Sequence, residues 1–286
     1  MGDSGVVLTL KHIGVMRSFV GFLKELVETV ACKVVVRPDF KGIEVLQLDK
    51  FHVCAIVANL ECDVGGVSPG EAFTVHFHTK KAHRIFKKAR DENVLEIHVP
   101  NEGSDIFFFE KNPIGQGVVR RKELKKIESD YETIDIPDIV YKTRLQISLA
   151  ELRDIIEDGV REESDIFNIT VERAPFESVL VNKIIFRTFG EIPSKVEYKT
   201  VHDAGDVETI VIDEMSNNRD DLPEPVAPWS TVYDFKFTIK FLKPLLELAT
   251  QELLLFLDNN VPLRIHYPID DTSFVSLFVS PKMQEE

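Results

Sequence analysis

The sequence predicts an α+β protein built from two similar domains. Four stretches of the 286-residue chain share one order, in which a short alternating strand precedes an amphipathic helix and further strands follow. The stretches form two pairs, and an acidic, proline-containing segment at 129–137 separates the pairs. The length also suits two domains of roughly 140 residues, each large enough to bury a hydrophobic core.

The first pair of stretches occupies the N-terminal part of the chain. Strands are expected where apolar and polar residues alternate, and helices where apolar residues recur every three or four positions. The first stretch is expected to hold a strand at 6–10, a helix at 13–30 and strands at 33–37, 42–48 and 53–60. The second is expected to hold a strand at 72–77, a helix at 79–90 and strands at 94–99 and 106–110.

The second pair follows the acidic segment. Its first stretch is expected to hold a strand at 141–147, a helix at 149–159 and strands at 167–171, 183–188, 195–201 and 209–212. Its second is expected to hold a strand at 234–237, a helix at 239–250 and strands at 253–257, 263–267 and 274–279. Loops are expected at 112–126 and at the proline-rich 217–228. We therefore expect domains at 1–128 and 142–286, joined by an extended connector at 129–141.

Composition and charge exclude several classes of protein. With 34 Lys and Arg against 48 Asp and Glu, the net charge is −14, which excludes binding of nucleic acid by overall attraction. A hydrophobic content of 44% excludes a disordered acidic tail. No apolar run approaches the roughly 18 residues of a membrane span, so no membrane partner is expected.

The cysteines and the N-terminus indicate the compartment. Cys32, Cys54 and Cys62 are odd in number and unclustered, which is typical of a reducing compartment without a disulfide framework. The N-terminus lacks the basic and long apolar regions of a signal peptide. We expect an intracellular protein whose cysteines are small buried side chains.

The helix expected at 79–90 concentrates positive charge. Its apolar residues Ala82, Ile85, Phe86 and Ala89 recur at helical spacing and predict one buried stripe. Its cations are Lys80, Lys81, Arg84, Lys87, Lys88 and Arg90, and no acid precedes Asp91. A solvated lysine-rich face is the alternative interpretation of a single helix of this kind.

Two other expected helices carry fewer cations. These are Arg17 and Lys24 in the first helix, and Lys240 and Lys243 in the fourth. The third helix does not follow, because Arg153 is outnumbered there by Glu151, Asp154, Glu157 and Asp158. Cations on three helices of an acidic chain indicate one surface that is suited to phosphate.

Several segments resemble the proliferating cell nuclear antigen (PCNA) family of sliding DNA clamps. The segment 42–53, which ends in Leu-Asp-Lys-Phe-His-Val, resembles the family's Gly-Val followed by Met-Asp-Ser-Ser-His-Val. Ile134-Asp135-Ile136-Pro137 resembles the connector's Leu-Gly-Ile-Pro. Val-Pro-Leu at 261–263 with Tyr267 resembles Val-Pro-Leu-x-x-x-Tyr, and 277–282 resembles Tyr-Tyr-Leu-Ala-Pro-Lys. The order and spacing of these segments cover nearly the whole chain.

The resemblance implies a DNA clamp fold. Three subunits, each with two clamp domains, would form a ring whose helices line a central hole and whose antiparallel sheets lie outside. Duplex DNA would pass through the hole, where basic helices meet its backbone without reading bases. The implied DNA-facing residues are Arg17, Lys24, Lys80, Lys81, Arg84, Lys87, Lys88, Lys240 and Lys243. Processivity would come from encirclement, and neither a catalytic residue, a metal nor a cofactor is implied.

The resemblance also implies a groove beneath the connector that accepts short clamp-binding peptides with aromatic anchors. The matching positions are Leu48, His52, Val53, Ile134, Ile136, Pro137, Tyr141, Pro262, Phe278, Val279, Ser280 and Pro281. Taken singly, the apolar members of this set are equally well explained as ordinary core residues.

Ring closure in the family pairs edge strands of neighbouring subunits. The resemblance implies one such edge at 105–110, with Ile106, Phe107, Phe108 and Phe109. It implies the other at 195–199, with Val196 and Tyr198. A monomer would expose an apolar aromatic edge, so we expect a homotrimer.

The implied function is a processivity factor that tethers DNA polymerase and other replication and repair enzymes to duplex DNA. A clamp loader would be a further partner. The protein is expected in the nucleus or, for a divergent virus-encoded member, at the site of viral DNA replication. The acidic third helix keeps open a second possibility, a subunit of a heterotrimeric damage-signalling clamp.

A metal-dependent nucleic-acid enzyme is the alternative from another class. His76 and His78 alternate on one expected strand with His83 nearby, but no third ligand at fixed spacing accompanies them. The sequence also contains no phosphate loop, dinucleotide fingerprint or nucleophile elbow. The basic run at 120–126 is interpreted as a charged loop, with a nuclear import signal or a DNA-touching loop as alternatives.

Overall fold

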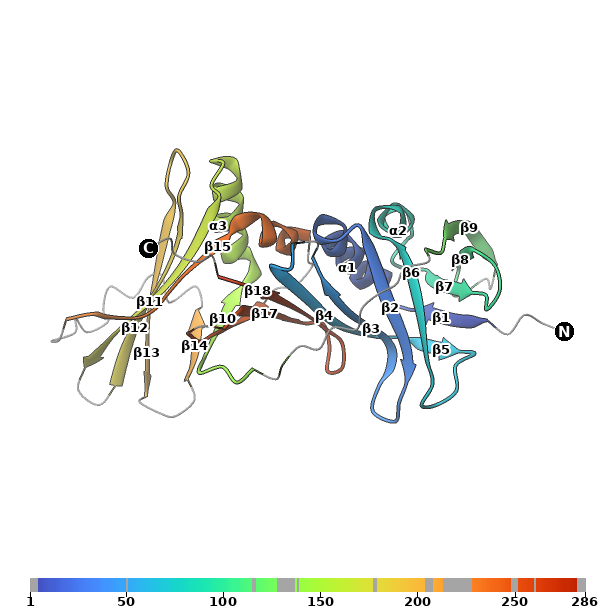
Figure 1. The fold of residues 1–286 in the computed structure, drawn as a ribbon, viewed down its shortest axis with the longest axis horizontal. Coiled ribbons are helices and arrows are strands. Elements are labelled where there is room, and N and C mark those ends of the chain that lie inside the picture. Colours follow the sequence, from blue (N-terminus) through green and yellow to red (C-terminus); the bar gives the residue numbers. More distant parts are fainter. Residues whose placement is uncertain are drawn as a thin grey trace. The chain divides into compact units, whose positions relative to one another are not determined.

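The computed structural model describes residues 5–49, 51–114, 117–127, 137, 139–176, 179–203, 208–212, 228–247, 252–259 and 261–281. The chain divides into two compact α+β units (Figure 1). The first comprises residues 1–136, 247–249 and 268–276, and the second comprises 137–246, 250–267 and 277–286. The division at 136/137 falls within the connector expected at 129–141. Residues 129–136 of that connector, and the loop expected at 217–228 apart from Pro228, lie outside the described residues.

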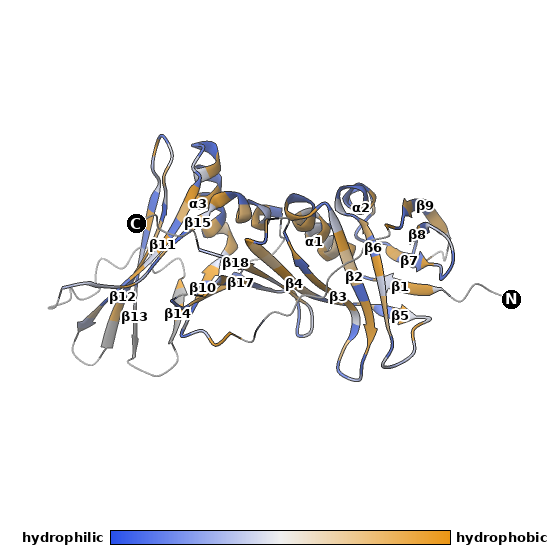
Figure 2. Cartoon of the chain, viewed as in Figure 1, coloured by the Kyte–Doolittle hydropathy of each residue, from blue (hydrophilic) through white to orange (hydrophobic). Residues whose placement is uncertain are grey.

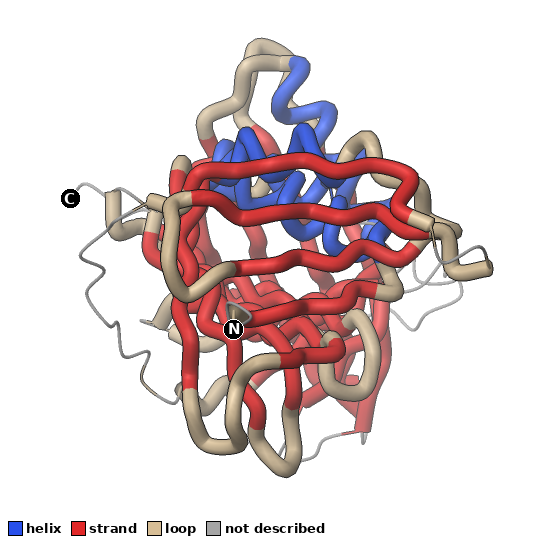
Figure 3. The backbone as a smooth tube through the Cα atoms, turned by 90° about the vertical axis from the view of Figure 1, so that its right-hand side faces the viewer, coloured by secondary structure: helices blue, strands red, loops and turns tan. Residues whose placement is uncertain are grey.

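The N-terminal unit contains two antiparallel arrays of strands. One sheet has the order β5-β1-β7-β8-β9 and consists of β1 (Val6–Leu10), β5 (Asp63–Gly65), β7 (Val94–Val99), β8 (Asp105–Lys111) and β9 (Val118–Lys125). The other array runs β4-β3-β2-β6 and consists of β2 (Thr29–Val36), β3 (Lys41–Leu48), β4 (Cys54–Glu61) and β6 (Ala72–His78). Figure 3 shows these strands together with the helices that cover them.

Two helices bury their apolar stripes in this unit. Helix α1 (Ile13–Leu26) buries Phe19 and Leu23, and helix α2 (Thr79–Phe86) buries Ala82 and Phe86. The ring of Phe86 meets Phe108 of β8 edge-on, with 6.0 Å between ring centroids. Apolar and polar residues alternate along the strands (Figure 2), so one face of each strand joins the core. All three cysteines are buried, as expected, and burial raises the pKa of the Cys32 and Cys62 thiols to about 12.

The C-terminal unit repeats the strand-helix-strand plan. Its four-stranded antiparallel sheet has the order β13-β12-β11-β15, with β11 (Ile166–Phe176), β12 (Val179–Thr188), β13 (Lys195–Asp203) and β15 (Ser230–Thr238). Its other strands follow the order β14-β10-β16-β17-β18, with β10 (Thr143–Ser148), β14 (Glu208–Ile212), β16 (Glu252–Leu257), β17 (Leu263–Pro268) and β18 (Phe274–Val279). Strand β14 pairs with β10 in parallel.

Helix α3 (Leu149–Arg161) begins at a side-chain cap and packs closely on its sheet. The hydroxyl of Ser148 accepts a hydrogen bond from the amide of Ala150, which satisfies one free donor at the helix start. At Gly159, a Cβ atom would lie 2.5 Å from the Ile239 side chain and 2.7 Å from the Thr188 side chain, so a larger residue would force these side chains to shift. The close packing sets the position of α3 against β12.

Three expectations about elements were wrong. The helix expected at 239–250 is instead two 3-10 segments, η2 (Ile239–Phe241) and η3 (Lys243–Glu247), because Pro244 lacks an amide hydrogen and interrupts helical pairing. The first helix ends at Leu26 rather than residue 30, because strand β2 begins at Thr29. The loop expected at 112–126 contains strand β9. Among the described residues, no helix is both long and apolar enough to cross a bilayer.

Candidate nucleic-acid interface and partner groove

Helix α2 and the turn that follows it at 87–90 present a basic face to solvent, called the basic face of α2 below. The buried hydroxyl of Thr79 donates to the carbonyl oxygens of Val27 and Glu28, which anchors the start of the helix. The exposed cations of this face are Lys80, Lys81, Arg84, Lys87, Lys88 and Arg90. Within the described part of the chain, none of these cations forms an ion pair, whereas Arg17 and Arg120 nearby do. The face therefore keeps its positive charge available to a ligand.

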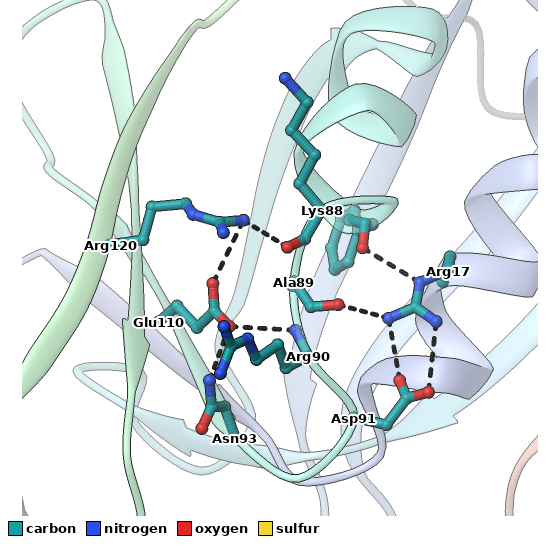
Figure 4. Close-up of polar contacts among 9 residues, drawn as sticks. Arg17, Lys88, Ala89, Arg90, Asp91, Asn93, Glu110 and Arg120 are labelled. Carbon is teal, nitrogen blue, oxygen red and sulfur yellow. Dashed lines mark hydrogen bonds and ion pairs between the residues drawn. The ribbon is translucent and has the colours of Figure 1, made fainter.

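The end of α2 is held by Arg17 of α1 (Figure 4). The Arg17 guanidinium donates from Nε to the carbonyl of Phe86 at 3.1 Å and from Nη2 to the carbonyl of Ala89 at 2.5 Å. It also pairs with the Asp91 carboxylate at 2.9 Å. The carbonyl of Phe86 also accepts from the Ala89 amide at 3.1 Å, so Arg17 gives it a second donor. Arg17 thereby ties the last turn of α2 and the residues after it to helix α1. The sequence placed Arg17 among the DNA-facing cations, and the structure gives its guanidinium this internal role.

The other predicted cations fall into two groups. Lys24 is mostly buried and pairs with Glu247 at 3.0 Å and with Glu25 at 3.4 Å, so carboxylates already neutralise its charge. Lys240 and Lys243 are exposed on η2 and η3, and the Lys240 ammonium lies 5.0 Å from the ring centroid of Phe241. In helix α3 the exposed Asp154 and Glu157 leave this part of the surface acidic, as the sequence indicated.

A buried carboxylate joins the end of α2 to strands β8 and β9. Glu110 of β8 is 2% exposed and accepts hydrogen bonds from the Arg90 amide at 3.0 Å and the Asn93 side chain at 2.6 Å. Its second oxygen lies 3.5 Å from the Arg120 guanidinium of β9. Arg120 also donates to the carbonyl of Lys88 (Figure 4). This link was not predicted from the sequence, because residue 120 was expected to lie in a loop.

The segment 105–110, which was expected to be an edge strand for ring closure, is not an edge strand within its sheet. Strand β8 pairs with β7 on one side and with β9 on the other, so its backbone groups are already used. Ile106 and Phe108 are buried in the core, and the Arg121 guanidinium lies over the rings of Phe107 and Phe109. The open edge of this sheet is β9.

Strand β13, by contrast, is an edge strand as predicted. It pairs only with β12 in its sheet. Tyr198 is 2% exposed and meets Phe186 edge-on at 5.9 Å, so its side chain belongs to the core. Val196 is half-buried. The pairing groups that this strand can offer are therefore its backbone amides and carbonyls.

In the N-terminal unit, the groove candidates lie on the loop between β3 and β4. The buried Asp49 carboxylate shapes this loop by accepting from the amides of Phe51 at 3.0 Å, Val53 at 2.7 Å and Cys54 at 2.8 Å. The turn places His52 at φ 58°, a left-handed conformation that few non-glycine residues adopt. Leu48 and Val53 are half-buried, so they are not simple core residues.

In the C-terminal unit, a second set of groove candidates forms a half-buried aromatic cluster. The hydroxyl of Tyr141 donates to the carbonyl of Pro262 at 2.9 Å, and its ring lies 5.8 Å from that of Phe256. The Arg264 guanidinium lies 5.0 Å from the Phe256 ring and 5.7 Å from the Phe278 ring. Phe256 and Arg264 were not among the predicted groove residues, although their alternation with buried residues along β16 and β17 indicates the same face.

The remaining groove candidates are divided by burial. Val279 is fully buried and is a core residue, whereas Ser280 and Pro137 are exposed and Pro281 is half-buried. Ile134 and Ile136 lie outside the described residues. Beside the cluster, burial and then the nearby Arg264 lower the pKa of His266 to about 4, so this imidazole is neutral at physiological pH.

The histidines of β6 do not belong to a metal-binding group among the residues that the structure describes. His76 and His78 are half-buried, and burial lowers the pKa of His76. No group of three or more His, Cys, Asp or Glu side chains with metal-binding geometry occurs in the described ranges.

Comparisons with known proteins agree with the resemblance seen in the sequence. No model of a known protein family matches the chain. The proliferating cell nuclear antigen of Caenorhabditis elegans is 23% identical over 277 residues, which cover 93% of this chain and 95% of that protein. The crystal structure of proliferating cellular nuclear antigen from Entamoeba histolytica matches with a TM-score of 0.70 and 15% identity, over 97% of this chain and 99% of that one. The chain therefore has the α+β DNA clamp fold.

Replacing Arg17 by Gln is expected to lower the free energy of unfolding by about 1–3 kcal/mol, because the carbonyls of Phe86 and Ala89 lose their charged donor. Urea denaturation followed by circular dichroism measures this change. Lys11→Gln is the control, because it removes an exposed ion pair with Asp63 and should leave the midpoint almost unchanged. Equal stability of the Arg17 variant and the wild type would contradict the role of Arg17 at the end of α2.

Proposed function

We propose that this chain, a divergent sliding clamp of the proliferating cell nuclear antigen family, encircles duplex DNA and acts as a processivity factor. It would tether DNA polymerase and other replication and repair enzymes to the duplex, and a clamp loader would open the ring. Clamps of this family are not enzymes, which sets aside the alternative of a metal-dependent nuclease. The observation that carries the proposal is the basic face of α2, whose exposed cations have no acidic partner among the described residues.

The physical argument starts from the distribution of charge. The chain carries a net charge of −14, so overall attraction to DNA is unfavourable. Lysines on a helix face can still neutralise backbone phosphates without reading bases, which permits sliding. We assign this role to Lys80, Lys81, Arg84, Lys87 and Lys88, with Lys240 and Lys243 as further contacts. Arg17 and Lys24 contribute less, because carbonyl groups and carboxylates already hold their charges.

Neutralising four cations of α2 tests this assignment. The variant Lys80→Gln, Lys81→Gln, Arg84→Gln and Lys88→Gln is expected to bind a 30-base-pair duplex at least tenfold more weakly at about 50 mM salt, because each lost phosphate contact removes one unit of counterion release. Fluorescence anisotropy over a salt series measures both the affinity and its salt dependence.

A control variant carries the same change in net charge away from α2. It replaces Lys33, Arg37, Lys142 and Arg161, which are exposed and lie near carboxylates, by Gln. We expect a much smaller loss of affinity from this variant. If the two variants lost affinity equally, α2 would have no special role in contacting DNA.

Ring closure is proposed between β9 of one subunit and β13 of the next, since both are open edges. The amide of Lys126 donates to the carbonyl of Ser104 at 2.7 Å, and hydrogen-bonded pairs alternate along an antiparallel ladder. By this alternation, the backbone groups of Arg121 and Glu123 point away from β8 and toward the open edge. They are therefore free to pair with a strand from a neighbouring subunit.

Replacing Glu123 by Pro is expected to convert a trimer into monomers without unfolding the subunit, because this amide faces the open edge. Light scattering should give three times 32.6 kDa for the wild type and for a Glu123→Ala control, and 32.6 kDa for the proline variant. A wild type that stays monomeric at micromolar concentration would exclude the homotrimer. It would leave the damage-signalling heterotrimer as the alternative.

Partner binding is proposed on the aromatic cluster of β16–β18 in the C-terminal unit, and a separate partner contact is proposed for the loop around His52 in the N-terminal unit. Phe278 and Tyr141 are half-buried and offer apolar surface to an aromatic anchor of a peptide. The left-handed conformation of His52 adds support, because strained backbone of this kind is often retained for binding. The proposal places enzyme recruitment on surfaces that the basic helix does not use.

The variant Phe278→Ser is expected to weaken binding of a synthetic peptide with two aromatic anchors by at least tenfold, because it removes a central apolar contact. Isothermal titration calorimetry measures the affinity, and Phe278→Leu, which keeps apolar surface, should retain most of it. Unchanged affinity in the serine variant would place the peptide site elsewhere.

The site of action proposed for such a clamp is the nucleus or a viral replication site.

A further inference from the structure

A small cavity on the N-terminal unit is surrounded by cations from two elements. The volume of this basic cavity is about 140 Å³, and a separate hollow beside α1 is larger, at about 430 Å³. The basic cavity is lined by Arg84 and Ile85 of α2, by Lys88 of the turn that follows α2, and by Arg120 and Lys122 of β9. We propose that it binds a phosphate group of the duplex backbone. The proposal rests on the clamp function proposed above and extends the DNA-binding surface from α2 to strand β9.

The alternation of β9 brings its cations to α2. Leu124 is 4% exposed and faces the core, so Lys122 and Arg120, which lie two and four positions before it, point to the same face. Arg121 lies on the opposite face, over the rings of Phe107 and Phe109. The strand therefore divides its positive charge between the two sides of the sheet.

One wall of the cavity is held in place. Arg120 donates to the carbonyl of Lys88 and lies 3.5 Å from the Glu110 carboxylate, so its guanidinium is oriented before any ligand arrives. The Glu110 carboxylate is buried and is itself bonded by the Arg90 amide and the Asn93 side chain. A preorganised cation loses less conformational freedom on binding an anion.

The charge of the cavity favours an anion. Arg84, Lys88 and Lys122 are exposed, and none pairs with a carboxylate in the described ranges of the chain. Glu110 offsets part of the charge of Arg120, so four cations face one carboxylate and leave about three uncompensated positive charges. Ile85 supplies an apolar wall that offers no competing acceptor. This excess of positive charge suits a phosphate group.

The position of the cavity favours a backbone phosphate over a free small anion. Two of its residues belong to the basic face of α2, so the charged surface continues beyond the cavity along Lys80, Lys81 and Lys87. A polyanion can contact the whole surface, whereas a single ion uses only the cavity. Pairing of the β9 edge with another subunit uses backbone groups in the plane of the sheet and leaves the Lys122 side chain accessible.

The test compares Lys122→Gln with Arg121→Gln. Both variants remove one positive charge from the same strand, but the two side chains lie on opposite faces. Binding of a 30-base-pair duplex is measured by anisotropy over a salt series. We expect Lys122→Gln to lose threefold or more in affinity at low salt and to reduce the salt slope by about one. Arg121→Gln should change neither quantity, and Lys122→Arg should keep both.

Equal losses in the two glutamine variants would overturn the inference, because they would reflect net charge alone. If the four-residue α2 variant lost affinity and Lys122→Gln did not, the β9 contact would be excluded while the clamp function stood. If neither variant lost affinity, the clamp function would fail as well. Binding of inorganic phosphate is measured at constant ionic strength as a further comparison. If the wild type bound phosphate saturably, and Lys122→Gln lost that binding without any change in duplex affinity, the cavity would be a site for a small anion and not for the DNA backbone.

Discussion

The basic surface depends on the hydrogen bonds that hold the end of helix α2. This helix has 8 residues, too few to persist in water on propensity alone, and its neighbouring cations repel one another. Arg17 and Arg120 donate to its terminal carbonyls from opposite sides, and the buried Glu110 fixes the turn that follows. At the other end, Thr79 ties the helix to the segment before β2. These contacts keep the lysines of α2 directed to solvent.

The same arrangement separates two kinds of cation. Arg17, Lys24 and Arg120 are used inside the N-terminal unit, where carbonyls and carboxylates compensate their charge. The lysines of α2 and Lys122 of β9 keep their charge for a ligand. An acidic protein can hold DNA on such a surface because encirclement removes the need for overall attraction. In the clamp role proposed above, the acidic residues elsewhere would discourage DNA from binding outside that surface.

Much of the fold could be predicted because the strands alternate strongly and the helices carry clear apolar stripes. Strand β9 could not, since its sequence, Val-Val-Arg-Arg-Lys-Glu-Leu-Lys, buries only Leu124 and has almost no apolar alternation. The three phenylalanines of β8 suggested an exposed aromatic edge, but β9 covers that side of the strand. In the last helical region, apolar spacing predicted one long helix, but Pro244 lacks an amide hydrogen and interrupts the helical hydrogen bonds.

By itself, the sequence determined the α+β class, the repeated plan, the burial of the cysteines and the concentration of cations at 79–90, because these features depend on local spacing. The tertiary structure determined which cations are held by carbonyl or carboxylate groups of the chain and which are exposed without such a partner among the described residues. Arg17 and Lys81 both lie on the polar sides of amphipathic helices, and nothing in their neighbours along the chain distinguishes them. The partners of Arg17 lie 69 to 74 residues away, and only folding brings those carbonyls and Asp91 within hydrogen-bonding distance.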